Sequence, residues 1–408
     1  TKATPSADGK SYTINGQKMW ITNGGFADIF IVFAKIEDDE NLSAFIVEKE
    51  MGGIRLNPEE KKMGIKGSST RQVFFEDTVV PAENLLFERG QGFKIAVNIL
   101  NIGRIKLSAA AIGACKATIH RAVAYANERQ QFGRPIAKYG AIRHKIGEQI
   151  IRTFACESAT YRAGQNIEDA IAELKAQGMS EQEAELKGVE QFAIECAMMK
   201  VHGSETLDYV VDEGVQIYGG MGYSAEAPMD RAYRDARINR IFEGTNEINR
   251  MLTVDMILKR AMKGELDLMG PAQKVAGELM EIPDFGAKAT EDPLEKAHES
   301  IAKFKKSILL VAGAAVQKLM MELAKEQEVL MHIADMAIET YVAESTLLRV
   351  QKLMQRDGAE AHQDKLDMLQ VLVYDTADRL WVSGKNALHG FAEGDELRMM
   401  TMGLKRFT

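Results

Sequence analysis

The sequence predicts an α+β fold in which a partial β-barrel or sheet domain precedes two helical modules. Three observations predict it. Apolar and polar residues alternate with a strand-like period over the first ~90 of the 408 residues, and a helical period takes over from Gly90. Proline is rare, with 8 residues beside 34 Gly, which fits a chain rich in helices. Because the strands precede the helices instead of alternating with them, the order favours α+β over a repeating strand–helix–strand fold.

The strands are expected where short apolar runs are bounded by turn residues. Tyr12 and Ile14 alternate with polar neighbours, and Asn15-Gly16 is a pair typical of a hairpin turn. Further strand-like runs are Lys18–Thr22, Ile29–Ala34, Ala44–Val47 and Gln72–Phe75, and Pro81 closes the last of them. These runs predict a β domain over residues 1–91.

Helical periodicity starts with Ile95 and Ile99 and predicts an all-α bundle over residues 92–260. Within it, Ser180 and Glu183 have the spacing of a capping box, so we expect a helix to begin there.

Residues 261–294 are expected to be a linker, because Pro283 and Gly286 interrupt any helical pattern. An extra helical domain rich in Leu, Met and Ala is expected over residues 295–408. No apolar run in the sequence reaches the ~18 residues that a membrane-spanning helix needs, and the longest, Ile308–Val316, lies in this domain.

Composition excludes several classes of protein. Hydrophobic residues at 46% and charged residues at 27% are typical of a globular protein. The net charge of −8 argues against nucleic acid or an anionic membrane as the main partner. The 22 methionines are either soft core filling or part of a pocket for flexible acyl chains. The seven histidines show no metal-ligand spacing, so no metal site is expected. Three cysteines fit a reducing, cytoplasmic location without disulfides: Cys115, Cys156 and Cys196.

Two segments carry residues suited to a flat, charged ligand. In Met19–Gly24, Trp20 could cover a planar ring and Thr22 could bind it by a hydrogen bond. The alternative is a tryptophan packed in the core. Arg129 and Arg134 flank a turn and could hold phosphate through forked hydrogen bonds; the alternative is a solvated helix end.

Two further segments indicate a binding surface and a base. Gln216–Tyr223 is rich in glycine but lacks the spacing of a dinucleotide fingerprint, so its glycines more plausibly let the backbone approach a ligand closely. Glu243 precedes a helix that Thr245 or Asn246 could cap. The apolar pair Ile241–Phe242 would exclude water from its carboxylate, as a base for a weakly acidic C–H proton requires. The alternative is an exposed loop glutamate.

In this order, the segments resemble the acyl-CoA dehydrogenases, and most nearly the very-long-chain type with an extra C-terminal helical domain. The resemblance covers about Tyr12 to Leu258 and rests on Met19–Gly24, Lys62–Arg71, Phe75–Pro81, Ile99–Arg104, Glu128–Gly133, Gln216–Tyr223 and Arg234–Ile248. Residues 295–408 match by helical character and position. The family's N-terminal helical domain is expected to lie outside this chain, with residue 1 falling inside the middle domain.

The resemblance implies a flavoprotein oxidoreductase with FAD. It would convert long or very-long-chain acyl-CoA to trans-2-enoyl-CoA in fatty acid β-oxidation. Glu243 would remove the α-proton, the β-hydride would go to the flavin, and an electron-transfer flavoprotein would take the electrons. The resemblance also implies a homodimer, located in the cytoplasm or, in a eukaryote, in mitochondria. Residues 295–408 would contact a membrane surface, or else form only an amphipathic core.

The resemblance also assigns the other site residues. Those that would bind the cofactor are Trp20, Ile21, Thr22, Arg129, Phe132, Gln216, Gly219, Gly220, Thr245 and Glu247. Those that would bind acyl-CoA are Ser68, Asn101, Arg104 and Gly244, of which Asn101 and Arg104 are expected to hold the CoA portion outside. Two alternatives stay open: an acyl-CoA oxidase or related flavin monooxygenase on the same fold, and a non-catalytic assembly homologue.

Overall fold

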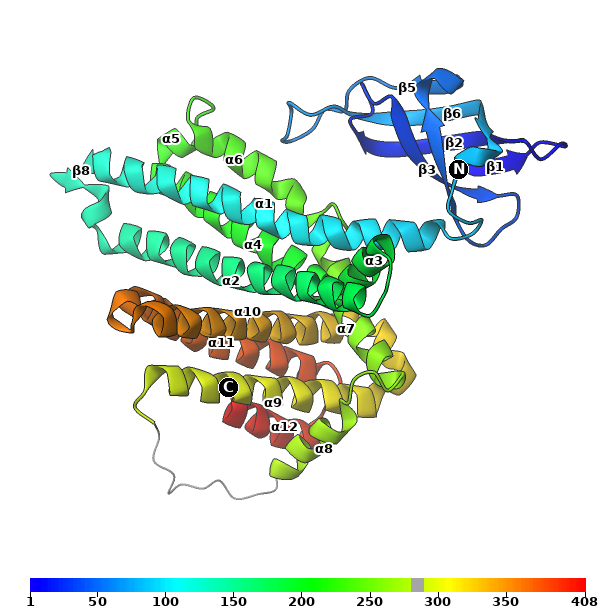
Figure 1. The fold of residues 1–408 in the computed structure, drawn as a ribbon. Coiled ribbons are helices and arrows are strands. Elements are labelled where there is room, and N and C mark those ends of the chain that lie inside the picture. Colours follow the sequence, from blue (N-terminus) through cyan, green and yellow to red (C-terminus); the bar gives the residue numbers. More distant parts are fainter. Residues whose placement is uncertain (280–289) are drawn as a thin grey trace. The chain divides into compact units, whose positions relative to one another are not determined.

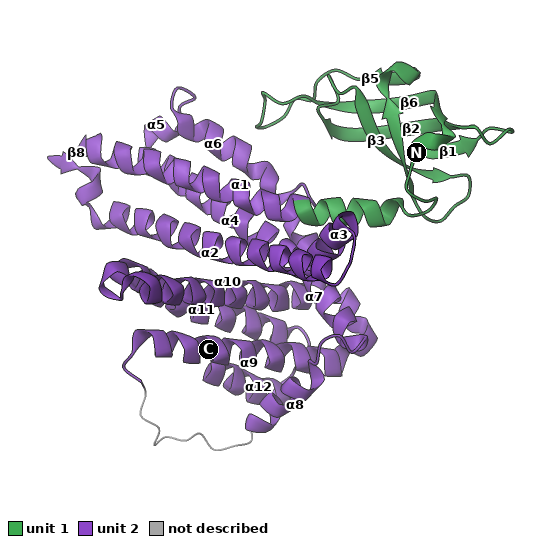
Figure 2. Cartoon of the chain, in the orientation of Figure 1, with its two compact units in different colours: residues 1–102 green, residues 103–408 purple. Residues whose placement is uncertain are grey.

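The computed structural model describes residues 1–279 and 290–408, and these form two compact units, residues 1–102 and 103–408 (Figure 2). Strands occupy the first unit and helices dominate the second (Figure 1), so the α+β prediction is confirmed. Of the expected linker, Pro283 and Gly286 lie outside the described residues.

The first unit is built on one seven-stranded sheet. Its strands are β1 (Lys2–Pro5), β2 (Ser11–Thr22), β3 (Ile29–Ile36), β4 (Ser43–Glu48), β5 (Ile54–Leu56), β6 (Thr70–Pro81) and β7 (Leu85–Leu86). The strand order is β5-β6-β2-β1-β3-β4-β7, with β1 and β3 parallel and the other neighbours antiparallel. Single 3₁₀ turns at Lys49–Met51 and Ala82–Asn84 connect strands.

The predicted hairpin turn at Asn15-Gly16 is wrong. Strand β2 runs through both residues, because it is paired with β1 on one side and with β6 on the other. The register with β6 shifts between Ile14 and Gly16, which makes this point a β-bulge. Glycine is needed there, since an added Cβ would lie 2.6 Å from the Cα of Thr1. The turn that joins β1 to β2 lies earlier, where the Ser6 amide donates to the Ser11 carbonyl.

The core of this unit follows from the period of two along each strand. In β3 the side chains of Phe30, Val32, Ala34 and Ile36 are buried, and the residues between them are more exposed. They pack with Phe45 and the inward residues of β2 and β6.

Long helices build the second unit. The first group is α1 (Gly92–Glu128, which begins in the first unit), α2 (Gly140–Ala176), α3 (Glu181–Gln191), α4 (Ala193–Tyr218), α5 (Gly220–Tyr223), α6 (Pro228–Ala236) and α7 (Asn246–Met262). The small ribbon β8 (Gln130–Gln131) and β9 (Arg134–Pro135) follows α1, and 3₁₀ turns occupy Ile136–Lys138 and Arg237–Arg240 (η4). Ser180 caps α3 as expected, accepting a hydrogen bond from the Glu183 amide.

The second group of helices is α8 (Met269–Glu278), α9 (Pro293–Leu319), α10 (Gln327–Asp357), α11 (Gln363–His389) and α12 (Gly394–Phe407), with 3₁₀ turns at Met320–Lys325 (η5) and Glu360–His362. Helix α8 lies inside the segment 261–294 that was predicted to be a linker. Its Val275 is buried in the same core as α9 and α12. This packing stabilises a helix that the local sequence pattern does not predict.

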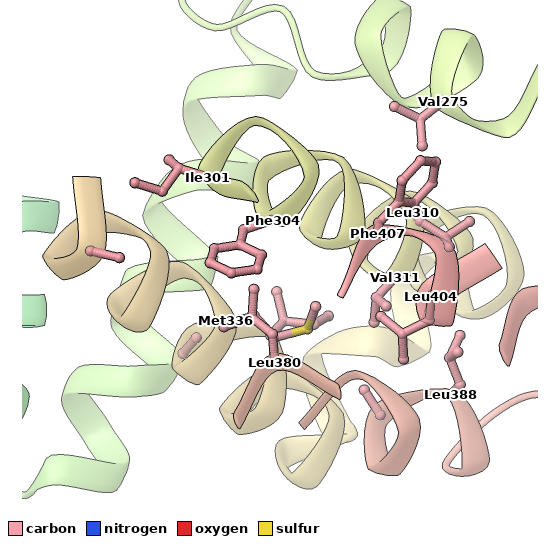
Figure 3. Close-up of a cluster of buried hydrophobic side chains, with 14 of the residues drawn as sticks. Val275, Ile301, Phe304, Leu310, Val311, Met336, Leu380, Leu388, Leu404 and Phe407 are labelled. Atoms are coloured by element: carbon pink, nitrogen blue, oxygen red, sulfur yellow. The ribbon is translucent and has the colours of Figure 1, made fainter. Parts of the chain in front are cut away.

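Figure 3 shows the core of these last helices. Phe304 from α9 and Met336 from α10 face Leu380 from α11, and Leu404 and Phe407 bring in α12. The apolar stripe of each helix is therefore used inside the bundle. Helix α10 also packs against α2 and α7, so the two expected helical modules form one compact unit.

By length and composition alone, α1 and Pro293–Lys325 are apolar enough to cross a membrane, contrary to the expectation that no segment is. This is weak evidence, because core helices pass the same test. Phe304 and Val311 of α9 are buried against neighbouring helices.

The packing around Phe304 gives a stability prediction. Phe304→Ala should lower the free energy of unfolding of the helical unit by about 3–5 kcal/mol, because it leaves a cavity in a close-packed core. Urea denaturation followed by circular dichroism measures it. Met321→Ala is the control, since this side chain is 83% exposed and its loss should cost less than about 0.5 kcal/mol. Equal effects of the two substitutions would contradict the packing.

Candidate active site

Glu243 lies in the loop 241–245, between η4 and α7. Its φ is 59° and that of Gly244 is 82°, so two successive residues have left-handed backbone. Thr245 ends the loop as the N-cap of α7, and its hydroxyl accepts a hydrogen bond from the Ile248 amide. The predicted cap is thus confirmed, and it fixes the direction in which the chain leaves the loop.

Two cationic side chains bind the carbonyls of this turn. Arg104 of α1 donates from Nε to the Glu243 carbonyl at 3.2 Å. Lys200 of α4 donates from Nζ to the Gly244 carbonyl at 2.7 Å, and at the same distance to Oδ1 of Asn246. Burial lowers the pKa of Lys200 to about 8, with the nearby Arg104 acting in the same direction.

A third donor completes this set. The Nδ2 atom of Asn249 lies 3.3, 2.8 and 3.0 Å from the carbonyl oxygens of Glu243, Gly244 and Thr245. Asn249 is buried one turn into α7, so the helix that follows the loop also binds it.

The carboxylate of Glu243 lies against the backbone of α1. A Cβ added to Gly103 would be 2.7 Å from Oε2 of Glu243, so only glycine leaves room for the carboxylate at this position. The expected apolar enclosure by Ile241 and Phe242 is wrong for the described chain, because these side chains are 48% and 41% exposed.

An ionic network extends from the loop to α10. Asn246 donates to the Ser204 hydroxyl and to Glu205, both on α4. Arg250 binds both carboxylate oxygens of Glu205 and, through Nε, Asp335 of α10 at 2.7 Å. Burial acts to raise the pKa of Glu205, but the bonds from Arg250 outweigh it and hold that pKa below its usual range.

Sequence reasoning missed the lysine and the two buried asparagines of this cluster. Lys200 interrupts the apolar run Ala197–Val201, and its side chain is fully buried. A charged residue inside an otherwise buried helix segment is rare unless it is paired, and this was the available signal. Asn246 and Asn249 gave no such signal, because polar residues are ordinary at a helix start.

A second cluster of predicted residues lies elsewhere in the helical unit. Arg129, Gly219 and Gly220 line a cavity of about 600 Å³, together with Tyr125 and Tyr218, whose rings stack at 4.0 Å. An added Cβ on either glycine would meet nothing within 4 Å, so backbone is open to the cavity there.

Phe132 and Gln216 flank this cavity in sequence without lining it. Phe132, between β8 and β9, has a φ of 50° and is 91% exposed. The Gln216 carbonyl accepts from the Gly219 amide and so helps to end α4.

The first unit contains three more of the predicted cofactor residues, Trp20, Ile21 and Thr22. Trp20 has a φ of 61° and is 61% exposed, beside a register shift between Lys18 and Ile21. The indole is thus presented to the surface and does not fill the core, which was the alternative. Ile21 and Thr22 continue β2 to its end.

The predicted acyl-CoA residues are separated. The Ser68 carbonyl accepts from Lys62, beside a cavity of about 740 Å³ that Ser68 also lines. Asn101 and Arg104 are buried on α1, at 1% and 5% exposure, and their predicted role in holding the CoA portion stays a prediction. Gly244 lies in the Glu243 loop. Contact of these residues with a substrate stays a prediction.

Thr245 and Glu247 also have local roles. The backbone amide of Glu247 and then the Thr245 hydroxyl bind the Glu247 carboxylate and lower its pKa. Both side chains thus stabilise the start of α7.

The residues of each unit suit different parts of a nucleotide ligand. In the first unit, Trp20 offers an exposed ring that suits a flat group. In the second unit, Phe132 offers another exposed ring, and Arg129 offers a guanidinium beside two glycines, which suits a phosphate. Glu243 offers an acceptor of protons in a fixed position. Within residues 1–279 and 290–408, no group of three or more His, Cys, Asp or Glu side chains could hold a metal ion.

Three family models match the chain: the acyl-CoA dehydrogenase middle domain at residues 1–78, and the acyl-CoA dehydrogenase C-terminal domain at residues 90–258 and, in a second form, at 303–406. A probable acyl-CoA dehydrogenase of Bacillus subtilis is 45% identical over 412 residues, which cover all of this chain and 68% of the relative. The human mitochondrial very long-chain specific acyl-CoA dehydrogenase is 37% identical and matches 90% of this chain and 57% of its own length.

Among solved structures, an acyl-CoA dehydrogenase of Bacillus anthracis complexed with FAD has a TM-score of 0.96 at 45% identity. The match covers all of this chain and 69% of that one. The boundaries of the expected domains and the roles of the individual site residues stay predictions.

The network around Arg250 can be tested by stability. Arg250→Met should lower the free energy of unfolding by about 3 kcal/mol, because it leaves two carboxylates on facing helices without their cation. Arg398→Met is the control: Arg398 pairs with Asp395 on the surface, where both side chains are highly exposed, and its loss should cost less than about 1 kcal/mol. Denaturant titration compares them. A cost for Arg250→Met as small as that of the control would show that the network contributes little.

Proposed function

The chain belongs to the acyl-CoA dehydrogenase family, and on this basis we propose that the full-length protein oxidises the Cα–Cβ bond of an acyl-CoA thioester. FAD is its cofactor and Glu243 is its base. The observation that carries the proposal is the Glu243 loop. A carboxylate is seated against Gly103, and buried donors bind the carbonyls of its turn.

The α-proton of a thioester is a weak acid, so a carboxylate removes it only from a fixed and close position. The left-handed turn at Glu243 and Gly244 supplies such a position, because Arg104, Lys200 and Asn249 oppose its relaxation. Glu243 takes the α-proton in this proposal.

FAD, when bound, supplies the acceptor for the hydrogen that leaves Cβ with its electron pair. Trp20 and Thr22 are proposed to contact the flavin ring. Arg129 is proposed to bind phosphate through its guanidinium, with Gly219 and Gly220 leaving room for the backbone to approach. Phe132 would cover a further flat part of the cofactor.

Several finer points are proposals too. We favour long or very long acyl chains, in view of the identity to the very long-chain relative and the matching helical segment 303–406. An electron-transfer flavoprotein is proposed as the acceptor and a homodimer as the assembly, with the exposed Phe132 and its cavity reaching the FAD of the second copy. The three buried, free cysteines support a reducing compartment, either cytoplasm or mitochondrial matrix. Peripheral contact with a membrane would fall to α9–α12.

The base assignment is tested with Glu243→Gln in the full-length protein. This substitution keeps size and removes the proton acceptor, so the rate of flavin reduction by palmitoyl-CoA should fall by about 10²–10⁴-fold. Anaerobic stopped-flow absorbance measures that rate, and FAD content and thermal stability should stay unchanged. Full activity in this variant would refute the base assignment.

The same assay separates the alternatives. The wild-type protein should reduce an electron-transfer flavoprotein and form little hydrogen peroxide in air; the opposite result would identify an oxidase. A kcat/KM that is higher for butyryl-CoA than for palmitoyl-CoA would contradict the proposed chain length.

Gly103→Ala tests the seat of the carboxylate. The new methyl would displace the Glu243 side chain, and a shift of about 1 Å can cost ~10²-fold in rate. Gly113→Ala is a matched control on α1, where an added Cβ meets nothing within 4 Å. Both substitutions favour the helix by about 1 kcal/mol in propensity. We therefore expect both proteins to fold and only Gly103→Ala to lose activity. Equal activities would show that the contact between Gly103 and the Glu243 carboxylate does not position the base.

A further inference from the structure

Among the lysines in residues 1–279 and 290–408, Lys200 is set apart by its burial. Its side chain has no exposed surface, and it projects from α4 toward the loop that carries Glu243. A buried ammonium is costly unless hydrogen bonds compensate it.

The two hydrogen bonds of Lys200 bind the end of the loop and the first residue of α7. At 2.7 Å each, the Lys200 ammonium binds the Gly244 carbonyl, one residue after Glu243, and the Asn246 side chain, at the first residue of α7. Charged donors at this distance make stronger bonds than neutral ones. Lys200 therefore links the left-handed turn to the start of the helix.

The second of these partners is itself held. Asn246 accepts from Lys200 through Oδ1 and donates through Nδ2 to Ser204 and Glu205, which follow Lys200 on α4 by about one turn. The Lys200 ammonium thus binds the turn from a rigid support on the same helix. A lysine that merely joined two helices would not need a bond to the residue next to the base.

We propose that Lys200 is a positioning residue for Glu243. It binds the Gly244 carbonyl and the side-chain Oδ1 of Asn246, and thereby fixes the backbone turn that orients the Glu243 carboxylate. Lys200 acts through the loop and not on the substrate. The kinetic part of this proposal rests on the proposed function, whereas the structural part does not.

The test uses Lys200→Met in the full-length, FAD-loaded protein. Methionine keeps the length and apolar stem, and it removes a buried charge, so the fold should be kept. Lys306→Met is the control for removing an inter-helix lysine, because Lys306 of α9 is partly buried and binds Glu278 of α8. If Lys200→Met yields no folded protein, Lys200→Gln, which keeps a neutral donor, is measured in its place.

The first readout is hydrogen–deuterium exchange. Peptides covering residues 241–250 should exchange at least about tenfold faster in Lys200→Met than in the wild type, as expected for a loop that opens more often. Peptides from α9–α12 should be unchanged, and Lys306→Met should leave residues 241–250 unchanged. This measurement does not depend on what the enzyme oxidises.

The second readout is the kinetic split. Misplacement of a base lowers kcat and leaves substrate binding intact, so kcat for palmitoyl-CoA should fall about 10–10²-fold, with KM and FAD content within twofold. Unchanged exchange in residues 241–250 would overturn the proposal, and so would faster exchange with a wild-type kcat. If Glu243→Gln is fully active, the proposed function fails, and the exchange data still decide whether Lys200 holds the loop.

Discussion

The left-handed turn at Glu243 and Gly244 is the constraint on which the candidate site depends. A non-glycine residue in that conformation costs of the order of 1–3 kcal/mol, so the surroundings must over-determine it. They do so through carbonyl oxygens: the turn exposes three in succession, and buried donors from Arg104, Lys200 and Asn249 bind them. Relaxing the turn would break these hydrogen bonds to buried donors, and that loss opposes the release of strain.

This arrangement makes the base depend on how helices are packed. The donors come from α1, α4 and α7, so the loop has its geometry only when all three helices are in register. Helix α10 joins them through Asp335, because Arg250 binds it and Glu205 together. The helices that follow residue 290 are therefore part of the support of the site, and they share a compact unit with it.

Features that depend on neighbouring residues could be predicted from the sequence, whereas features that depend on contacts between distant residues could not. The order of strands and helices, the position of Glu243 and the cap at Thr245 depend on patterns within a few residues, and the sequence predicted them. Asn15-Gly16 has the local pattern of a turn, but pairing on both sides keeps it in a strand. The role of Lys200 and the burial of Arg104 depend on partners 44 and 139 residues away, which no local pattern reveals.

A strained backbone and an exposed aromatic side chain occur together at two further positions. Trp20 and Phe132 have positive φ, and their aromatic rings are largely exposed. Phe132 has an edge-to-face contact with the Tyr139 ring, and its carbonyl accepts a hydrogen bond from the Tyr139 hydroxyl, but 91% of the residue stays exposed. Tyr223 is as exposed as Phe132, but it has ordinary helical backbone, and a single exposed aromatic ring needs no explanation. At each of these two positions, considered separately, cover of the ring by the proposed flat cofactor would offset the cost of the backbone and of the exposed apolar surface.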